Sequence, residues 1–206
     1  MPSNPFPHEP MPSKPVPHEP ALSGATLLQS WRPLWRPVLA MIIVVVASNW
    51  LVQYPINAWL TWGAFVYPIA FLVNDLTNRA VGVAAARRVA WAGFAVAVVA
   101  SLAVAPWRIA LASGTAFIVS QLADVRVFNR LRRQAWWKAP LLGSSVASVI
   151  DTIIFFAIAF AGTSLDWWLL AIGDLGVKLV MAVVLLGPYR AMLPRLQAWV
   201  PQGRPC

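Results

Sequence analysis

The chain has 206 residues, of which 59% are apolar and only 11% are charged. A soluble domain carries roughly 25% charged residues, so this composition excludes a water-soluble globular fold. The net charge of +9 is compatible with nucleic-acid binding, but a membrane protein with basic cytoplasmic segments explains it better, and we expect no nucleic-acid partner.

Residues 1–20 are a tandem repeat, MPSNPFPHEP followed by MPSKPVPHEP, with eight prolines. Such a segment cannot pack a core, so residues 1–30 are predicted to be a disordered proline-rich tail. The repeat has no apolar run of the kind found in a signal peptide. Residues 201–206 are expected to form a short C-terminal tail.

Residues 31–200 are predicted to form one transmembrane domain. Apolar blocks of about 20 residues match the length of helix that crosses the hydrocarbon core, and they do not alternate as barrel strands do. The expected fold is an all-α polytopic bundle of six transmembrane helices. The spans are expected at residues 37–54, 60–77, 89–105, 109–126, 141–162 and 168–187.

Basic residues set the expected orientation of this bundle. With the N-terminus inside, fourteen lysines and arginines fall in cytoplasmic segments, whereas Arg108 alone falls outside and Lys178 lies within a span. The positive-inside rule therefore places both termini in the cytoplasm. Two three-helix halves would have to be related by inverted topology, and Asp75 and Asp151 would then be rough equivalents.

Twelve tryptophans lie near the predicted span ends. Most are expected to form interfacial belts, since the amphipathic indole ring suits the headgroup layer. Trp50 and Trp62 are the two considered for stacking on a flat ligand.

Cysteine and histidine are nearly absent. Cys206 is the only cysteine, and His8 and His18 both lie in the N-terminal tail. One thiol cannot form an intrachain disulfide, and the apolar body has no imidazole ligand or proton relay. We therefore expect no metal, no cofactor and no catalytic residue. A nucleophile motif such as GxSxG is also missing, so an enzyme is not expected.

Four aspartates nevertheless touch predicted spans: Asp75, Asp124, Asp151 and Asp174. A charged side chain in the middle of a span costs about 2.5–3.5 kcal/mol, so each requires a structural or functional reason. In the fifth span, Ser144, Ser148 and Asp151 share one helix face. In the fourth span, a stripe through Gly114 and Phe117 ends at Gln121 and Asp124.

The spacing of these acids from nearby bases permits three ion pairs. Asp75 and Arg79 are four residues apart, as are Asp174 and Lys178, which allows a pair within each helix. Asp151 and Lys178 lie at similar depth, near the bilayer midplane, which allows a pair between helices. These groups either hold the helices together or line a cavity for a small, polar, planar solute. An aspartate suits a guanine-like edge because it accepts hydrogen bonds from N1–H and the exocyclic amine together.

Several segments carry a resemblance to a known family over about residues 40–195. They are Ser48-Asn49-Trp50-Leu51-Val52-Gln53, Thr61-Trp62-Gly63-Ala64-Phe65, Asp75-Leu76-Thr77-x-Arg79, Gln121-x-x-Asp124-Val125-x-Val127-Phe128-Asn129-Arg130, Trp136-Trp137, Asp151-Thr152 and Asp174 with Lys178. The order of these segments, their spacing and their positions relative to the spans resemble those of the queuosine precursor transporters. That family is grouped with vitamin-uptake-type transporters.

This resemblance implies import of 7-cyano-7-deazaguanine, and of its 7-aminomethyl relative, to supply queuosine for tRNA. The substrate-binding residues that it implies are Asn49, Gln53, Trp62, Asp75, Arg79, Gln121, Asp124, Asn129, Asp151 and Lys178. The alternative is a substrate-binding membrane component of an energy-coupling-factor system, which depends on separate ATPases. The chain has no GxxxxGK[ST] motif of its own. The sequence leaves open whether transport is proton-linked or facilitated, and it leaves the oligomeric state open.

Overall fold

The computed structural model describes residues 34–51, 54–57, 60–164 and 167–196. Both predicted tails lie outside these residues, as does Gln53. Each of the six predicted spans contains helix in this part of the chain. The second span contains two helices, α3 (Gly63–Val66) and α4 (Ile69–Val81). The other five contain α2 (Trp35–Leu51), α5 (Val83–Val104), α6 (Trp107–Leu131), α7 (Lys138–Phe160) and α8 (Trp167–Val184). They are followed by α9 (Leu186–Leu196), and β1 (Pro55–Asn57) pairs with β2 (Leu60–Thr61) in a short antiparallel hairpin.

The predicted helical membrane architecture is confirmed in its coarse form. Three helical segments, Val83–Ala103, Lys138–Phe160 and Trp167–Val184, are long and apolar enough to cross a membrane, and α2 is apolar but shorter. The six-span count, the inverted halves and the position of the termini remain predictions.

The helices end where the local chemistry requires it. Gly82 separates α4 from α5 with φ of +101°, a conformation that residues with a Cβ rarely adopt. Ala105 is extended before Pro106, as expected of a residue preceding proline, and α6 begins directly after it.

The second predicted span, residues 60–77, is not one helix. Its first two residues are β2, and the helical part is split into α3 and α4 around Tyr67 and Pro68. Proline has no N–H to donate to the carbonyl four residues earlier, so the helix is interrupted there. This break places the Tyr67 side chain at the centre of the bundle.

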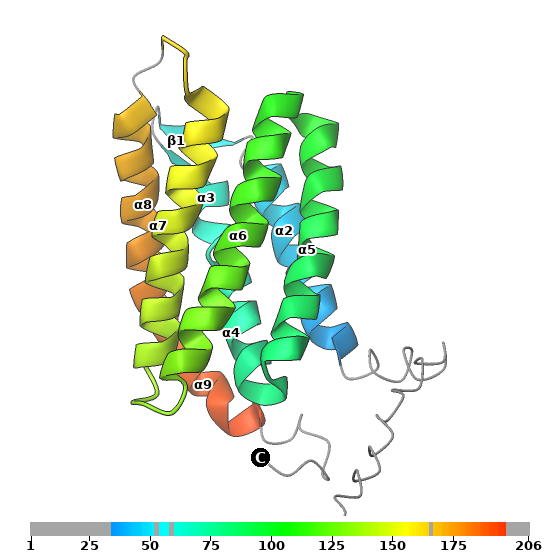
Figure 1. Ribbon diagram of the computed structural model, residues 1–206, viewed down its shortest axis with the longest axis vertical. Helices are drawn as coiled ribbons and strands as arrows, with labels where there is room; N and C mark the ends of the chain where they lie inside the picture. The colour runs from blue at the N-terminus through cyan, green and yellow to red at the C-terminus, as the bar shows by residue number, and fades with distance from the viewer. Residues whose placement is uncertain (1–33, 52–53, 58–59, 165–166, 197–206) are drawn as a thin grey trace, which may run out of the picture. The chain divides into compact units, whose positions relative to one another are not determined.

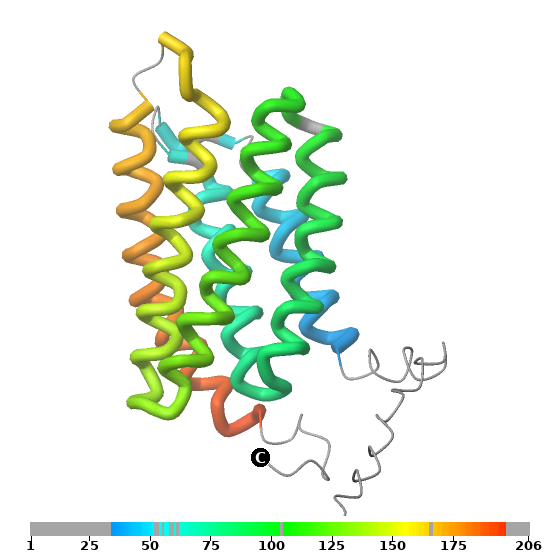
Figure 2. The backbone as a smooth tube through the Cα atoms, in the orientation of Figure 1, coloured from blue at the N-terminus to red at the C-terminus, as the bar shows by residue number. Residues whose placement is uncertain are grey.

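Figure 1 shows the helices side by side, with the β1–β2 hairpin at one end and α9 at the other. We call these the hairpin end and the α9 end. The tube in Figure 2 shows α5, α6, α7 and α8 running between the two ends. Helix α4 packs against α2, α5, α6, α7 and α9, so it forms the centre of the α9-end half.

Two asparagine side chains of α4 donate hydrogen bonds to the backbone of α6. The Nδ2 atoms of Asn74 and Asn78 donate to the carbonyl oxygens of Gln121 and Val125, each at 3.3 Å. Both asparagines are buried, and they are one helical turn apart, so the two contacts form a ladder along the helix pair. These two hydrogen bonds hold the polar faces of α4 and α6 against each other.

Large apolar side chains cover the outside of this bundle. Among the tryptophans that the structure describes, seven are exposed: Trp35, Trp50, Trp62, Trp91, Trp107, Trp137 and Trp168. Exposed apolar side chains on this scale are typical of a lipid-facing surface. Trp50 and Trp62 are 61% and 55% exposed, so neither is placed to stack on a ligand inside the bundle.

Candidate functional site

A cavity of about 230 Å³ lies within the bundle, toward the hairpin end. Residues of α2, α3, α5, α6, α7 and α8 line it, together with Tyr67 at the break before α4. Its walls run from Gly63 and Ile109 near the hairpin end to Asp151 and Lys178 in the middle of their helices. Every long helix in the described part of the chain therefore contributes to this one space.

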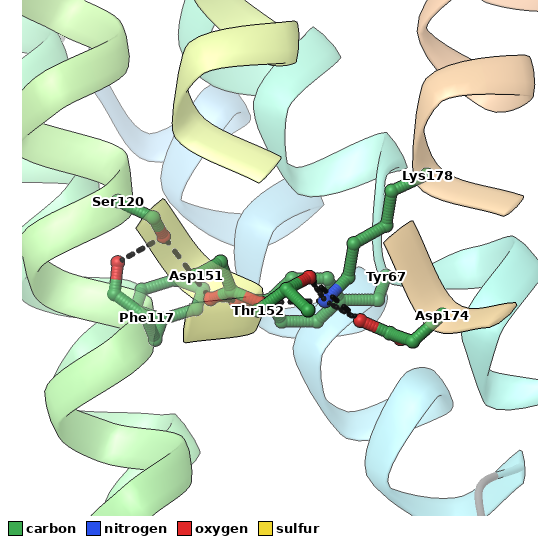
Figure 3. A network of polar contacts seen from close by, with 7 residues as sticks. All are labelled: Tyr67, Phe117, Ser120, Asp151, Thr152, Asp174 and Lys178. Carbon is green, nitrogen blue, oxygen red and sulfur yellow. Dashed lines mark hydrogen bonds and ion pairs between the residues drawn. The ribbon is translucent and has the colours of Figure 1, made fainter. Parts of the chain in front are cut away.

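Asp151, Asp174 and Lys178 line the cavity at its end away from the hairpin. Figure 3 shows these residues as an ionic cluster with the hydroxyl groups around them. Lys178 of α8 donates to Oδ2 of Asp151 on α7 at 2.8 Å, and it also pairs with Asp174 one turn earlier on α8. Only 6% of the Asp151 and Lys178 side chains is exposed, compared with 24% of Asp174. Asp174 is thus the acid of this cluster that is more open to a ligand.

Hydroxyl groups complete the hydrogen bonding of the cluster. Tyr67 Oη donates to Asp151 Oδ1 at 2.8 Å, and Ser120 Oγ lies 3.2 Å from the same oxygen. Thr152 Oγ1 donates to Asp174 Oδ2 at 2.9 Å. The Tyr67 ring also lies under the ammonium group, 5.5 Å from Lys178 Nζ to the ring centroid. These contacts fix the orientation of both carboxylates.

Two of the three ion pairs that the spacing permits are therefore present, Asp151–Lys178 and Asp174–Lys178. The predicted Asp75–Arg79 pair is wrong. The Arg79 guanidinium donates to the backbone carbonyl of Arg132, just beyond the end of α6. Terminal helix carbonyls have no partner within their own helix, so they attract cationic donors.

Apolar and weakly polar groups form the other walls of the cavity. Phe117 and Phe155 line it, and Phe117 packs edge-on against Tyr67 with ring centroids 6.2 Å apart. Ser101 Oγ donates to Asn49 Oδ1 at 3.1 Å, which joins α5 to α2 at the wall opposite the ionic cluster. The cavity thus combines flat aromatic surfaces with polar groups at two positions, a common arrangement in small-molecule sites.

Of the nine predicted site residues that the structure describes, three line this cavity: Asn49, Asp151 and Lys178. Trp62 and Asn129 are exposed and are not among the residues that line it, and Arg79 is bound to the end of α6. Gln53 lies outside the described residues.

Asp75, Gln121 and Asp124 form a second buried group, nearer the α9 end than the cavity. Asp75 and Asp124 are each 1% exposed, although helical periodicity predicts a shared polar face only for Gln121 and Asp124. Periodicity could not separate two polar groups at different depths, because one helix face passes through both.

Sequence reasoning missed Tyr67, Ser101 and Phe117 as site residues, and it placed Asp174 only in an ion pair. A signal existed for Tyr67, since a phenol within a membrane span needs a hydrogen-bond partner and the following Pro68 marks a break. For Phe117 the available signal was its position on the polar stripe of the fourth span, with Gln121 and Asp124.

The charges of the cluster favour a ligand rich in hydrogen-bond donors. Two carboxylates and one ammonium group leave a formal charge of −1 in a largely buried setting. Lys178 offsets one acid, and the more exposed Asp174 retains accepting capacity because an ionised carboxylate offers about four lone-pair positions. A neutral or cationic ring with N–H groups on one edge would complement this surface.

A bundle of apolar helices around a buried polar cavity defines the class, which is that of multi-pass membrane transporters of small molecules. The chain matches the putative vitamin uptake transporter family over residues 61–106 and 100–192. It belongs to this family, together with proteins named queuosine precursor transporters.

The queuosine precursor transporter of Escherichia coli (strain K12) is 35% identical, over 74% of this chain and 82% of the relative. The probable queuosine precursor transporters of Haemophilus influenzae and Bacillus subtilis are 31% and 28% identical, over 71% and 63% of this chain and 80% and 69% of the relatives. No solved structure matches the chain.

Proposed function

We propose that the protein imports queuosine precursors, 7-cyano-7-deazaguanine and its 7-aminomethyl relative, across the bacterial inner membrane to supply queuosine for tRNA. The names of the relatives support transport of a queuosine precursor. The observation that carries the assignment to this chain is the buried Asp151–Lys178–Asp174 cluster at the inner end of an aromatic-walled cavity.

The size of the cavity favours a small base over a larger ligand. Sites for drug-sized ligands span about 300–1,000 Å³, and this cavity holds about 230 Å³. A single bicyclic base is appropriate for such a volume, whereas a nucleoside would add a sugar for which the walls leave little room.

The chemistry of a 7-deazaguanine matches the groups on the walls. Its N1–H and exocyclic amine donate hydrogen bonds, and Asp174, with the remaining capacity of Asp151, is suited to accept them. Phe117 and Phe155 offer flat surfaces for the ring. In this proposal Lys178 and Tyr67 hold the acids in position, and Asn49 serves the opposite side of the base.

The distribution of basic residues supports an orientation with both termini in the cytoplasm. Arg79, Arg87, Arg133 and Arg190 all lie toward the α9 end, and Arg108 lies toward the hairpin end. If the positive-inside rule holds, the α9 end is cytoplasmic, and the cavity lies in the outer half of the membrane.

The test is the queuosine content of tRNA in cells that cannot make deazaguanines and lack their own importer. These cells would express the normal chain, Asp151→Asn or Ser145→Ala, with 7-cyano-7-deazaguanine supplied at nanomolar concentration. Ser145 is on the same helix but does not line the cavity, so Ser145→Ala controls for a change in α7. We expect restoration by the normal chain and by Ser145→Ala, and loss with Asp151→Asn.

Failure of the normal chain, once it is detected in the membrane, would reject the substrate. A host without any energy-coupling-factor ATPase module separates the two modes of uptake. Restoration in that host supports a transporter that works alone, whereas restoration only with the module present would assign the chain to the alternative, a substrate-binding component.

A further inference from the structure

Two carboxyl groups meet inside the bundle, away from the substrate cavity. Asp75 of α4 and Asp124 of α6 are each 1% exposed, and both lie against the same turn of α7. Helix α7 closes the space beside them. Ser144 Oγ lies 3.5 Å from Asp75 Oδ2, and a Cβ on Gly143 would lie only 2.6 Å from Asp124 Oδ1.

No cation balances this pair within the described part of the chain. Asp75 Oδ1 and both Asp124 oxygens have no partner, and Asp75 Oδ2 has only the long contact with Ser144. Arg79 is one turn from Asp75 and could have been its counter-charge, but its guanidinium donates to the backbone carbonyl at the end of α6 instead. Two buried, adjacent, uncompensated carboxylates are too costly to remain ionised together, and such pairs retain one shared proton.

The geometry favours a proton over a metal ion. Two carboxyl groups offer too few oxygen ligands for Mg²⁺ or Ca²⁺, which take about six or more, whereas a single proton is shared by two carboxyl groups. Among the described residues, no group of three or more acidic, histidine or cysteine side chains could hold a metal ion.

A small adjoining cavity provides independent support. Asp75, Ser144 and Tyr189 line a space of about 10 Å³, close to the least volume that holds one water molecule. Tyr189 is completely buried, and its hydroxyl group has no hydrogen-bond partner in the described structure. A buried hydroxyl without a partner at a water-sized space next to a carboxyl indicates a place for a proton-carrying water.

The amide of Gln121 adds a second unpartnered group. It is fully buried without a partner for either polar atom, and it lies one turn from Asp124 on the same face of α6. Several buried polar atoms of this region therefore have no hydrogen-bond partner in the structure. This is expected where protons or water molecules bind and leave.

The carboxyl pair and the substrate cavity share one helix face. On α7, Ser144 touches the pair and Asp151 touches the cavity, seven residues and about 10 Å apart along the helix. Ser148, buried and without a partner for its hydroxyl group, lies between them. A movement of α7 that accompanies substrate binding would therefore also change the surroundings of Asp124.

The other ionisable groups around the pair lie toward the α9 end. They are Tyr189 of α9, Arg79 of α4 and Arg132 just after α6. Arg87 and Arg88 lie in the first two turns of α5, and Arg87 is exposed. Helix α7 contributes only hydroxyl groups to the pair, and the Lys178 ammonium of α8 is bound to Asp151 and Asp174.

We propose that Asp75 and Asp124 form a proton-binding site, distinct from the substrate cavity, and that release and rebinding of its proton accompany each import cycle. The coupling rests on the proposed function, whereas binding of the proton does not. The two parts are therefore tested separately.

Proton binding is measured on the full chain in lipid bilayers, by infrared difference spectroscopy between neutral and alkaline pH without substrate. We expect a protonated-carboxyl band that disappears in both Asp75→Asn and Asp124→Asn and remains in Thr77→Val. Thr77 is a matched control because it is buried on α4 and its hydroxyl donates only to its own helix, at Val73. A spectrum without this band, or a band that both variants retain, overturns the proton site.

Coupling is measured with the same preparations as liposomes that contain a pH indicator. With 7-cyano-7-deazaguanine outside, an imposed pH gradient should drive accumulation by the normal chain and by Thr77→Val, with proton entry. Asp75→Asn and Asp124→Asn should lose gradient-driven accumulation but still exchange labelled for unlabelled base. Exchange without any effect of the gradient on the normal chain overturns coupling alone. If the normal chain neither exchanges nor accumulates the base, the proposed substrate fails and coupling to its import is overturned with it, but the infrared result stands.

Discussion

Lys178 Nζ lies 2.8 Å from Asp151 Oδ2, although the two residues belong to different helices, α8 and α7. The same ammonium group is also bound to Asp174 on its own helix. Lys178 therefore has two acidic partners, whereas Asp151 has one basic partner and two hydroxyl donors, Tyr67 and Ser120. This asymmetry predicts different consequences for the loss of each residue.

Lys178→Met should destabilise the protein more than Asp151→Asn. The first change leaves the buried Asp151 and the partly exposed Asp174 without a counter-charge, and breaking a buried pair costs about 3–5 kcal/mol. The second leaves Lys178 paired with Asp174. The double variant should lose less than the sum of the two single losses, with a coupling of about 0.5–3 kcal/mol. Thermal unfolding of the four proteins in one detergent measures this, and strictly additive losses would contradict the pairing.

Tyr67→Phe should weaken binding of the precursor while the aromatic wall remains. The change removes the hydroxyl that donates to Asp151 at 2.8 Å, and a hydrogen bond to a charged group contributes about 1.5–3 kcal/mol. An apparent affinity lower by about tenfold or more is expected, since 1.4 kcal/mol corresponds to a factor of ten. Uptake at graded precursor concentrations is the measurement. Tyr54→Phe, at a tyrosine that is 49% exposed, is the control. Equal behaviour of the two variants would remove Tyr67 from the site.

Gly143→Ala should destabilise the packing of α7 against α6. Its added Cβ would lie 2.6 Å from Asp124 Oδ1, so the carboxyl group or the helix must move, at a cost of about 1–3 kcal/mol. Gly173→Ala on α8 is the matched control, because nothing lies within 4 Å of its added Cβ. In a helix interior that control change should be neutral or stabilising by up to about 1 kcal/mol. A comparison of melting temperatures decides the matter, and similar values for both variants would refute the close approach.

Arg108→Gln should loosen the hairpin end of α7. Arg108 Nε donates to the carbonyl oxygen of Ile158 at 2.8 Å, and its Nη2 donates to that of Ala161. These carbonyls are near the end of α7, where a cationic donor stabilises the helix by roughly 0.3–1 kcal/mol through the helix dipole, in addition to the hydrogen bonds. The control is Arg126→Gln, at an exposed position on the same helix, α6. Hydrogen exchange of the last turn of α7 should rise only with the Arg108 change, and equal exchange in both variants would contradict this role.

Much of the fold could be predicted from the sequence. Apolar blocks of membrane-spanning length located the helices, and the acid–base spacing of four identified the Asp174–Lys178 pair. Similar depth in two spans indicated the Asp151–Lys178 pair. The same reasoning failed for Asp75 and Arg79, because a spacing that permits a contact does not exclude a stronger competitor, here the carbonyl oxygen of Arg132.

What the sequence by itself determined is where most of the helices lie and which face of several of them is polar, because these follow from composition and from helical periodicity. Only the tertiary structure decided that Asp151 and Lys178 share a cavity with Tyr67 and Phe117, while Asp75 and Asp124 meet elsewhere. The physical reason is that helix rotation and the break at Pro68 depend on packing among all the helices at once. No single segment carries that information.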